Sequence, residues 1–479
     1  MPRTVRCPIP GTLWERPMGM AFCSHYHPVF LRRDKLEVDA RYMRFNFPAL
    51  CRKVMELSPA ASAITDCHKI EGGFNRVFIF TLDNGNRLVA RFPFRFTGPA
   101  KLSTLSEVST IRYLQQKTTI PIPNLVDWNH DAHHSKNPAG SEYMIMEHAS
   151  GVPLIEKWDG MAGNEKVNCI RSVNKAMKEA SDLQFPAKPL DTGFCFGPHC
   201  GTRCWDDDVR GAKYYQNVKP NHGPWRTICE FSDGLIDAGL SRVPPTDNVP
   251  DKQPAYHGSP EAHIALLKTA RSVLKQMALD PQIQKYRKPL LFHPDLHKRN
   301  IFVSEDDPTV IAAIIDWQDN EILKQAFDLT SQYYTPQLAG PRLVDESLFR
   351  PFLYSYRTWR DGTVALRQEL IETARLWHDL GLGGSCPYPS PSSGELAKHM
   401  KEYKLFEAAQ ELRVGMYSVI NTGDGGWVPT DQWEAAHGAN KELYHGALEA
   451  VLTNPDVDED EPVQDEETLR SIWPFDLPQ

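Results

Sequence analysis

Two short apolar segments enclosed by polar residues constrain this chain more than any other feature of its sequence. Ile301 to Val303 and Val310 to Ile315 have the length and composition of strands, and residues 305–308 between them suit a tight turn. Such a pair forms an antiparallel hairpin, in which the residue before the first strand and the residue after the second lie at the same open end. The sequence therefore predicts that Asn300 and Asp316 lie close together.

The residues at that end are of the types that phosphoryl transfer requires. Amide and carboxylate oxygens suit a hard cation such as Mg²⁺ that carries phosphate groups. Asp295 lies five residues before Asn300 on the preceding loop, where a carboxylate can orient or deprotonate an attacking hydroxyl. We predict Asp295 for that role, and Asn300 and Asp316 as metal ligands. The structural alternative is a capped turn whose polar side chains satisfy one another.

The spacing of these residues resembles a known family. His293-x-Asp295-Leu-His297-x-x-Asn300, followed by Ile315-Asp316-Trp317, is similar to the catalytic loop and the metal-binding aspartate of the aminoglycoside phosphotransferase family. The resemblance implies an α+β, two-lobed protein-kinase-like fold, with a small β-rich N-lobe and a larger, mainly helical C-lobe. It also implies His293, Asp295 and Asn300 as catalytic residues, and ATP and Mg²⁺ as cofactors.

The same resemblance assigns a nucleotide site to the N-terminal part of the chain. It implies a turn that covers the nucleotide, a phosphate-binding cation, a glutamate that pairs with this cation, and a hinge that holds adenine through its backbone. Gly72, Gly73 and Asn75 would form the covering turn, and Arg91 would be the phosphate-binding cation. Glu107 would pair with Arg91, and Glu147 and Ala149 would form the hinge. Two purely structural interpretations stay open. Gly72-Gly73 is typical of any tight turn, and Glu107 completes a capping box with Thr104.

The length of 479 residues exceeds what one hydrophobic core supports, so two lobes are expected. Residues 41–148 carry strand patterns, a hairpin signal at residues 83–86 and helices that begin at Asn46 and near Thr104. Residues 149–455 are mainly helical, with periodic segments at 167–183, 260–279 and 363–380. Within them, residues 185–259 are rich in Gly, Pro, Cys and Trp and indicate an insertion. Residues 456–479 form an acidic C-terminal tail, whose residues 472–475 are apolar enough to dock on the fold.

Composition narrows the partners and the compartment. The net charge of −8 comes without a basic stripe, so we expect no nucleic acid, and no apolar run is long enough for a membrane span. Ten cysteines without a secretory signal fit a reducing compartment. The segment 1–40 has the arginine bias of a mitochondrial presequence, with five arginines and one acid in its first 33 residues.

Nearly the whole chain resembles a fungal, mitochondrial group within that family. The stretches that carry this likeness are Glu71 to Phe80, Gly193 to Gly201, Phe292 to Val303 and Trp427 to Pro429. It implies a mitochondrial location, with the cytoplasm as the alternative.

Two departures from the family pattern bear on activity. Arg91 stands where most relatives hold a lysine, and a guanidinium reaches phosphate differently from an ammonium. Residues 319–329 are shorter than the matching region of similar fungal proteins. We therefore keep two functions open. One is a phosphotransferase that moves the ATP γ-phosphate to a hydroxyl of an unknown small molecule. The other is a catalytically weak kinase-fold protein that binds nucleotide or a partner.

Three other groups of residues have competing interpretations. Cys195, His199, Cys200 and Cys204 suggest zinc, but their spacing lacks paired C-x2-C motifs, which favours a compact turn with buried thiols. Ser259 fits a helix cap better than a hydrolase nucleophile, because no G-x-S-x-G frame surrounds it. Tryptophans such as Trp359 and Trp377 are typical of a core.

Overall fold

The chain folds into two units that alternate along the sequence. The computed structural model describes residues 5–6, 29–183, 193–201, 205, 219–246, 253–285, 287, 290–291, 293, 295–317, 345–453 and 461–477. The first unit takes Met1–Cys23, Met43–Trp205 and Lys285–Val344, and the second takes Ser24–Tyr42, Asp206–Gln284 and Asp345–Gln479. Because the first unit holds both the expected N-lobe and the expected catalytic loop, this division differs from the predicted lobes, whose boundaries stay a prediction.

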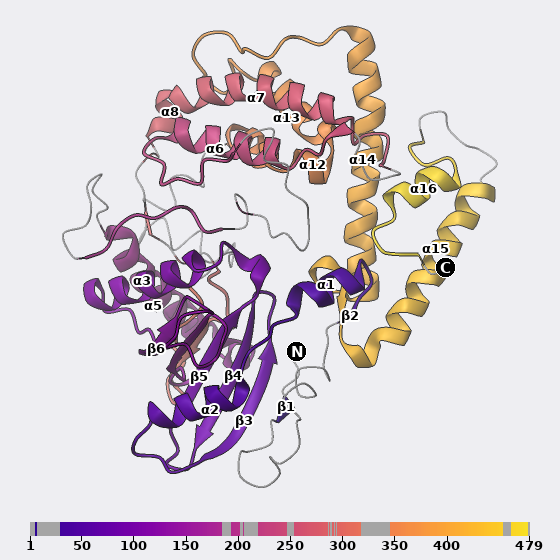
Figure 1. Ribbon diagram of the computed structural model, residues 1–479. Helices are drawn as coiled ribbons and strands as arrows, with labels where there is room; N and C mark the ends of the chain where they lie inside the picture. The colour runs from indigo at the N-terminus through magenta and orange to yellow at the C-terminus, as the bar shows by residue number, and fades with distance from the viewer. Residues whose placement is uncertain are drawn as a thin grey trace. The chain divides into compact units, whose positions relative to one another are not determined.

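A six-stranded sheet dominates the first unit (Figure 1). Every neighbouring pair is antiparallel, in the order β1 (Val5–Arg6), β3 (Ile64–Glu71), β4 (Asn75–Leu82), β5 (Arg87–Pro93), β7 (Tyr143–Glu147) and β6 (Leu125–Asn129). The predicted hairpin is formed by β4 and β5, and Gly85 takes φ +84 in its turn, a conformation that costs glycine little. Alternation along β4 buries Phe78, Phe80 and Leu82 on one face.

Helix α2 (Phe47–Glu56) covers the face of the sheet that carries these phenylalanines. Asn46 caps it as predicted, because its Oδ1 accepts a hydrogen bond of 3.1 Å from the Ala49 N–H. The Phe47 ring lies 5.3 Å from the Phe78 ring, and Leu50 is fully buried. Aromatic packing of this kind fixes the sheet against the helix.

Helix α3 (Leu102–Lys117) contradicts the interpretation of Thr104 and Glu107 as a capping box. Its N-cap is Lys101, one turn earlier than expected, so Thr104 and Glu107 lie inside the helix and form no capping box. The Thr104 hydroxyl donates to Glu142 at 2.8 Å, and Glu107 turns to Arg91. Contacts with residues outside the helix therefore determine the orientation of both side chains.

The predicted hairpin at residues 301–315 is present in the first unit. Strands β9 (Ile301–Val303) and β10 (Ile311–Ile314) pair antiparallel, and β8 (Val152–Pro153) adds a third strand next to β9. Their apolar residues share one core with α3 and with α5 (Gly163–Asp182), and the short α4 (Leu154–Trp158) follows β8. This core lies under the catalytic loop and includes Leu296, Ile301 and Trp317.

The second unit is mainly helical. Ser259 caps α7 as predicted, since its Oγ accepts from the Ala262 N–H at 3.3 Å. The predicted helix at 363–380 ends earlier, at Arg375. The longest helices that were not predicted individually are α6, inside the expected insertion, α14 and α15 (Trp433–Thr453). Between residues 219 and 420, the helices in the described part of this unit are α6 (Ile228–Ser241), α7 (Pro260–Leu279), α8 (Pro281–Gln284), α11 (Arg350–Ser355), α12 (Thr358–Asp361), α13 (Thr363–Arg375) and α14 (Ser393–Ile420).

Segments from both ends of the chain meet in the second unit. Strand β2 (Val29–Phe30) pairs antiparallel with β11 (Trp427–Val428), and α1 (Asp34–Arg41) follows it. The acidic tail contributes α16 (Glu466–Ile472), and Trp473 and Phe475 are buried, so its apolar end does dock. Deleting residues 1–38 as a removable leader would therefore take away β2 and buried Leu31. A cut that keeps β2 has to precede Val29, and it still removes the two-residue edge strand β1.

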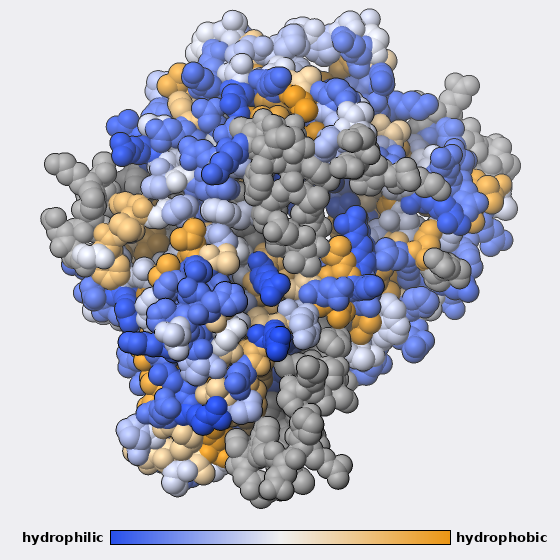
Figure 2. Space-filling view, viewed as in Figure 1, coloured by the Kyte–Doolittle hydropathy of each residue, from blue (hydrophilic) through white to orange (hydrophobic). Residues whose placement is uncertain are grey.

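The described helices contain no segment that combines the length and the apolar character of a membrane span. On the face in Figure 2, hydrophilic side chains cover most of the visible surface and hydrophobic ones lie in smaller groups between them. The observed combination of an antiparallel sheet and separate helical regions confirms the predicted α+β class.

Candidate active site

The hairpin brings the two predicted metal ligands to one end, as its geometry requires. The Ile315 N–H donates to the Asn300 carbonyl at 3.0 Å, which closes the ladder beside Asp316. Asp316 itself has φ +63, in the left-handed region. For a residue other than glycine this conformation costs about 1 kcal/mol. Local strain of this kind persists where surrounding contacts impose it, and it is common at functional sites.

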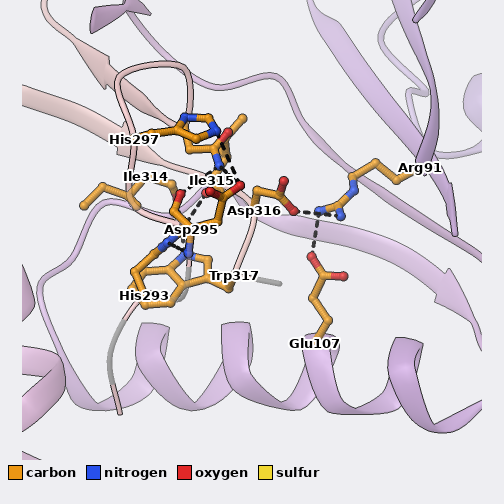
Figure 3. A network of polar contacts seen from close by, with 10 residues as sticks. Arg91, Glu107, His293, Asp295, His297, Ile314, Ile315, Asp316 and Trp317 are labelled. Atoms are coloured by element: carbon orange, nitrogen blue, oxygen red, sulfur yellow. Dashed lines mark hydrogen bonds and ion pairs between the residues drawn. The ribbon is translucent and has the colours of Figure 1, made fainter. Parts of the chain in front are cut away.

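The predicted catalytic loop, residues 293–300, holds Asp295 from two directions (Figure 3). Asn300 Nδ2 donates to the Asp295 carbonyl at 3.0 Å and to its Oδ2 at 3.2 Å. Because the amide nitrogen faces Asp295, the Oδ1 of Asn300 is the atom left for another partner. His297 Nε2 lies 3.4 Å from the same Asp295 Oδ2. His297 Nδ1 accepts from the Arg299 N–H at 3.2 Å, so the neutral ring carries its proton on Nε2, toward the carboxylate.

His293 connects the catalytic loop to the strand before Asp316. Its ring is 2% exposed; Nδ1 accepts from the Asp295 N–H at 3.1 Å, and Nε2 donates to the Ile315 carbonyl at 2.9 Å. Burial lowers the pKa of His293 to about 4, so the ring is neutral at pH 7 and both nitrogens are satisfied. The Trp317 ring packs on it at 4.6 Å. His293 thereby fixes the positions of Asp295 and Asp316 relative to each other.

Arg91 on β5 bridges two carboxylates with different nitrogens (Figure 3). Its Nη1 lies 2.6 Å from Glu107 Oε1 on α3, and its Nη2 lies 3.1 Å from Asp316 Oδ1. Burial acts to lower the pKa of Arg91, but the charges of Glu107 and then Asp316 outweigh it, so the pKa is raised. A guanidinium fork can serve both partners at once, whereas an ammonium is a point charge.

The predicted nucleotide-covering turn lies between β3 and β4. The Gly72 N–H donates to the Asn75 carbonyl at 2.9 Å, and Gly72 and Gly73 are exposed while Asn75 is buried. Neither glycine has positive φ, and a Cβ on Gly73 would meet no atom within 4 Å. The backbone of this turn is therefore open to an approaching ligand.

The predicted hinge follows β7. The Glu147 N–H donates to the Asn124 carbonyl at 2.9 Å, and the Glu147 carboxylate accepts from the Asn124 side chain at 2.9 Å. Ala149 is buried and shares a small apolar cluster with Phe302 and Ala313. Within the described ranges, no acceptor takes the Ala149 N–H.

The structure thus joins some of the predicted residues by direct contacts and leaves others apart. Contacts connect His293, Asp295, Asn300, Asp316, Arg91 and Glu107. The described contacts include none between these side chains and Gly72, Gly73 or Glu147. Sequence reasoning assigned no role to His297 or to Phe302 and Ala313. The motif spacing pointed to His297, but nothing in the local pattern singled out the apolar pair.

Two sequence hypotheses fall wholly or partly outside the described residues. Cys204, Gln318 and the short segment 319–329 are not among them. Cys195 is exposed, and the Cys200 thiol donates to the Pro198 carbonyl at 3.4 Å. No group of three or more His, Cys, Asp or Glu side chains within the described ranges could hold a metal ion.

Comparison with known proteins identifies the family. The model of the phosphotransferase enzyme family (APH) matches residues 66–362, which is more than half of the chain. The chain belongs to this family. The predicted resemblance and kinase-like fold class are therefore confirmed, and the matched range contains every residue of the candidate site.

Several fungal proteins are similar to this chain over part of their length. A subtelomeric hrmA-associated cluster protein of Aspergillus fumigatus is 27% identical over 299 residues, which cover 53% of this chain and 57% of that protein. Altered inheritance of mitochondria protein 9, mitochondrial, of Candida tropicalis is 29% identical over 157 residues, or 32% of this chain and 23% of that protein. The matches thus span little more than half of these relatives at most. Among solved structures, the streptomycin–ATP complex of APH(2")-IIa aligns over 74% of this chain and 94% of its own, with 13% identity and a TM-score of 0.34.

Proposed function

We propose that this protein is an ATP-dependent phosphotransferase that moves the γ-phosphate of ATP to a hydroxyl of a small molecule. The observation that carries the proposal is the connected set of charges around Asp316. Arg91 is braced by Glu107 and reaches Asp316 at 3.1 Å, while His293 ties the strand before Asp316 to Asp295. Phosphoryl transfer depends mainly on positioning and on charge stabilisation, and these residues supply both.

The nucleotide would be held by backbone and apolar groups. The buried Ala149 has an N–H without an acceptor in the described part of the chain, and a buried donor of this kind favours a ligand acceptor. Phe302 and Ala313 beside it offer an apolar surface for a flat base. In this proposal the Glu147 backbone also contacts adenine, Gly72, Gly73 and Asn75 cover the phosphates, and Arg91 binds them.

The donor set at the open end of the hairpin fits Mg²⁺. Asn300 Oδ1 and the Asp316 carboxylate are the oxygen ligands that this ion prefers. When bound, the ion would neutralise phosphate charge. Arg91 then has two tasks, because the same guanidinium that contacts Asp316 would also face the phosphates.

Asp295 would act on the acceptor. Its carboxylate, oriented by Asn300 and His297, would accept the proton of the attacking hydroxyl or align that hydroxyl for attack. His293 would act as a positioning residue, since its own nitrogens are engaged with backbone groups.

One contact favours the second function, a kinase-fold protein that binds nucleotide without efficient transfer. Arg91 Nη2 pairs directly with the Asp316 carboxylate, and this pairing competes with a metal for the same oxygen. Activity measurements on the purified chain decide between the two functions, and the first step is to establish nucleotide binding.

We expect Mg-ATP to raise the melting temperature of the purified protein, because a ligand that binds only the folded state stabilises it by about 2.7 kcal/mol at a hundredfold excess over Kd. Asp316→Asn should abolish the Mg-dependent part of the shift. Thermal unfolding with ATP, Mg-ATP and EDTA measures this. An unchanged melting temperature at millimolar Mg-ATP would rule out the nucleotide site and the phosphotransferase, and would leave a kinase-fold protein that binds a partner.

The proposed location is the mitochondrion. The relatives named mitochondrial and the arginine bias of the first residues support it, and the cytoplasm is the alternative. A fluorescent fusion to the C-terminus of the full chain tests the location by microscopy. The matching control removes residues 1–27, which keeps β2 and its pairing with β11 but takes away the two-residue edge strand β1.

A further inference from the structure

Three arginines gather where the two ends of the chain meet in the second unit. Arg32 and Arg33 lie between β2 and α1, and Arg413 lies on α14. Leu31 shares a hydrophobic cluster with Leu412 and Met416, the neighbours of Arg413 on α14. Partial desolvation and then the like charges of Arg33 and Arg413 lower the pKa of Arg32, although this side chain is still exposed to solvent. The guanidinium groups are therefore close enough to repel one another.

Two of these arginines lack the acidic partner that is usual in this unit. In the described part of the chain, Arg32 and Arg413 have no carboxylate oxygen within 4.0 Å. Among the residues that the structure describes, the buried Nε of Arg413 has no hydrogen-bond partner, and its Nη1 donates to the Gln410 side chain at 3.4 Å. Other arginines of the second unit do form ion pairs: Arg271, Arg350, Arg357, Arg360, Arg367, Arg375 and Arg470.

The surrounding acidic groups do not cancel this charge. Asp476 accepts from the Arg33 N–H at 2.5 Å and raises the pKa of Arg32 only as a minor cause. Asp34 accepts from the Phe30 N–H at 2.9 Å, and Asp361, which acts on neighbouring Tyr256, is already paired with Arg357 and Arg360. Three guanidinium charges against the nearby Asp476 leave about two positive charges at this place.

Two tyrosines supply neutral donors beside the arginines. Tyr417 lies one turn after Arg413 on α14, and its charge raises the pKa of Arg32. Burial raises the pKa of Tyr256, whereas the nearby charges of Arg413 and Arg32 act to lower it. Neither hydroxyl has a hydrogen bond in the described part of the chain. Unpaired guanidinium forks with hydroxyl donors are the usual means of binding an oxyanion.

We propose that Arg32 and Arg413, with Tyr417, bind a doubly charged phosphate group of a small molecule. A dianion matches the surplus of two charges, and two planar guanidinium groups can each donate in pairs to its oxygens. The site is independent of the proposed phosphotransferase chemistry, since all its residues belong to the second unit and none to the candidate active site. Binding there would cross-link the segment after β2 to α14 and stabilise the region where both chain ends meet.

Calorimetric titration with inorganic phosphate tests the proposal at pH 7.5 and constant ionic strength. We expect one saturable site per chain, and at least about tenfold weaker binding in Arg32→Gln and Arg413→Gln, because each variant loses charge-assisted hydrogen bonds. Sulfate, also a dianion, should compete with phosphate, whereas acetate should not. The matched control is Arg375→Gln, which removes a charge from the same unit at an exposed pair with Glu372 and should bind like the wild type.

Several results would overturn the proposal. These are the absence of saturable binding, equal binding by wild type and both variants, or weakening of equal size in Arg375→Gln. If either glutamine variant fails to fold, as judged by circular dichroism, Arg413→Lys replaces it. This variant keeps the charge but loses the fork, so it should show intermediate affinity; full wild-type affinity would contradict paired donation.

Discussion

Buried histidines in the two units are held in different ways. In the sheet-containing unit, His293 uses both ring nitrogens, one toward the Asp295 N–H and one toward the Ile315 carbonyl. In the helical unit, His263 and His399 are equally buried, but the Nδ1 of each has no partner among the described residues. The same side chain is thus fully hydrogen-bonded beside the candidate active site and only half satisfied in the helical core.

The helical histidines are held mainly by packing. His263 Nε2 lies 3.5 Å from His257 Nδ1, and His257 Nε2 donates to the Trp359 carbonyl at 2.7 Å. The rings of His257 and His263 lie 4.6 and 4.9 Å from the Trp359 ring. His399 makes one bond, to Gln368 at 2.7 Å. The expectation that Trp359 belongs to a core fits this arrangement.

This contrast shows that hydrogen bonds of a buried histidine fix the backbone beside the candidate active site, but not in the helical core. A buried polar atom without a partner costs about 1–3 kcal/mol, and the helical unit carries that cost at two histidines. Around Asp295 no such cost is seen at His293, because each of its bonds fixes a backbone group next to a residue with a proposed chemical role. Variants at these positions test whether the two units differ in this way.

The largest expected effect is on turnover. Asp295→Asn should lower ATP consumption with an acceptor by about 10²- to 10⁴-fold, because general-base help and orientation are lost. Mg-ATP affinity and stability should change little, since the amide oxygen can still accept from Asn300. ATP consumption against fractions of a metabolite extract and calorimetry with Mg-ATP measure both quantities. Background ATP loss in the wild type, with every fraction tried, would favour the binding protein over the enzyme.

Acid should destabilise both units, despite their different hydrogen bonding. Burial lowers the pKa of His263 to about 3 and that of His293 and His399 to about 4, against 6.5 in the unfolded chain. Between these pKa values the unfolded state binds more protons than the folded state. The contribution of each neutral histidine to the free energy of unfolding is therefore complete above pH 6.5 and is lost as the pH falls toward 4. Each histidine contributes about 1.4 kcal/mol per pH unit, which is roughly 3.5 kcal/mol for one histidine between pH 6.5 and pH 4.

Urea unfolding at pH 7, 5.5 and 4.5 measures this loss. The difference between wild type and His263→Leu isolates one histidine from the carboxylates that also titrate in acid. The variant should lose stability less steeply than the wild type below pH 6.5. Parallel pH profiles for the two proteins would show that His263 is not held neutral.

The smallest effect distinguishes the two kinds of histidine directly. His293→Leu should lower the free energy of unfolding by about 2–4 kcal/mol, because the Asp295 N–H and the Ile315 carbonyl lose their partner. His263→Leu should cost less than about 1 kcal/mol at pH 7, since a side chain of similar volume removes a half-satisfied polar ring. Urea midpoints of both variants give the comparison. Equal losses would mean that the unpaired Nδ1 of His263 has no energetic consequence.

Local sequence determined much of the site. The hairpin that brings Asn300 and Asp316 together, the β4–β5 hairpin, and the caps at Asn46 and Ser259 were all predicted. Each depends on contacts within a few residues, which a periodic pattern and a turn signal specify. The motif around Asp295 likewise placed the chain in its family before any geometry was known.

Tertiary structure decided what local sequence left open. Glu107 fits a helix cap by sequence, yet it pairs with Arg91, which lies 16 residues away, and Arg91 reaches Asp316 across 225 residues. Residues 1–40 were predicted as a leader from their arginine bias, yet β2 within them pairs with β11 near the other end of the chain. Partners so distant leave no periodic trace in either segment, because burial and pairing depend on the whole fold rather than on neighbours in sequence.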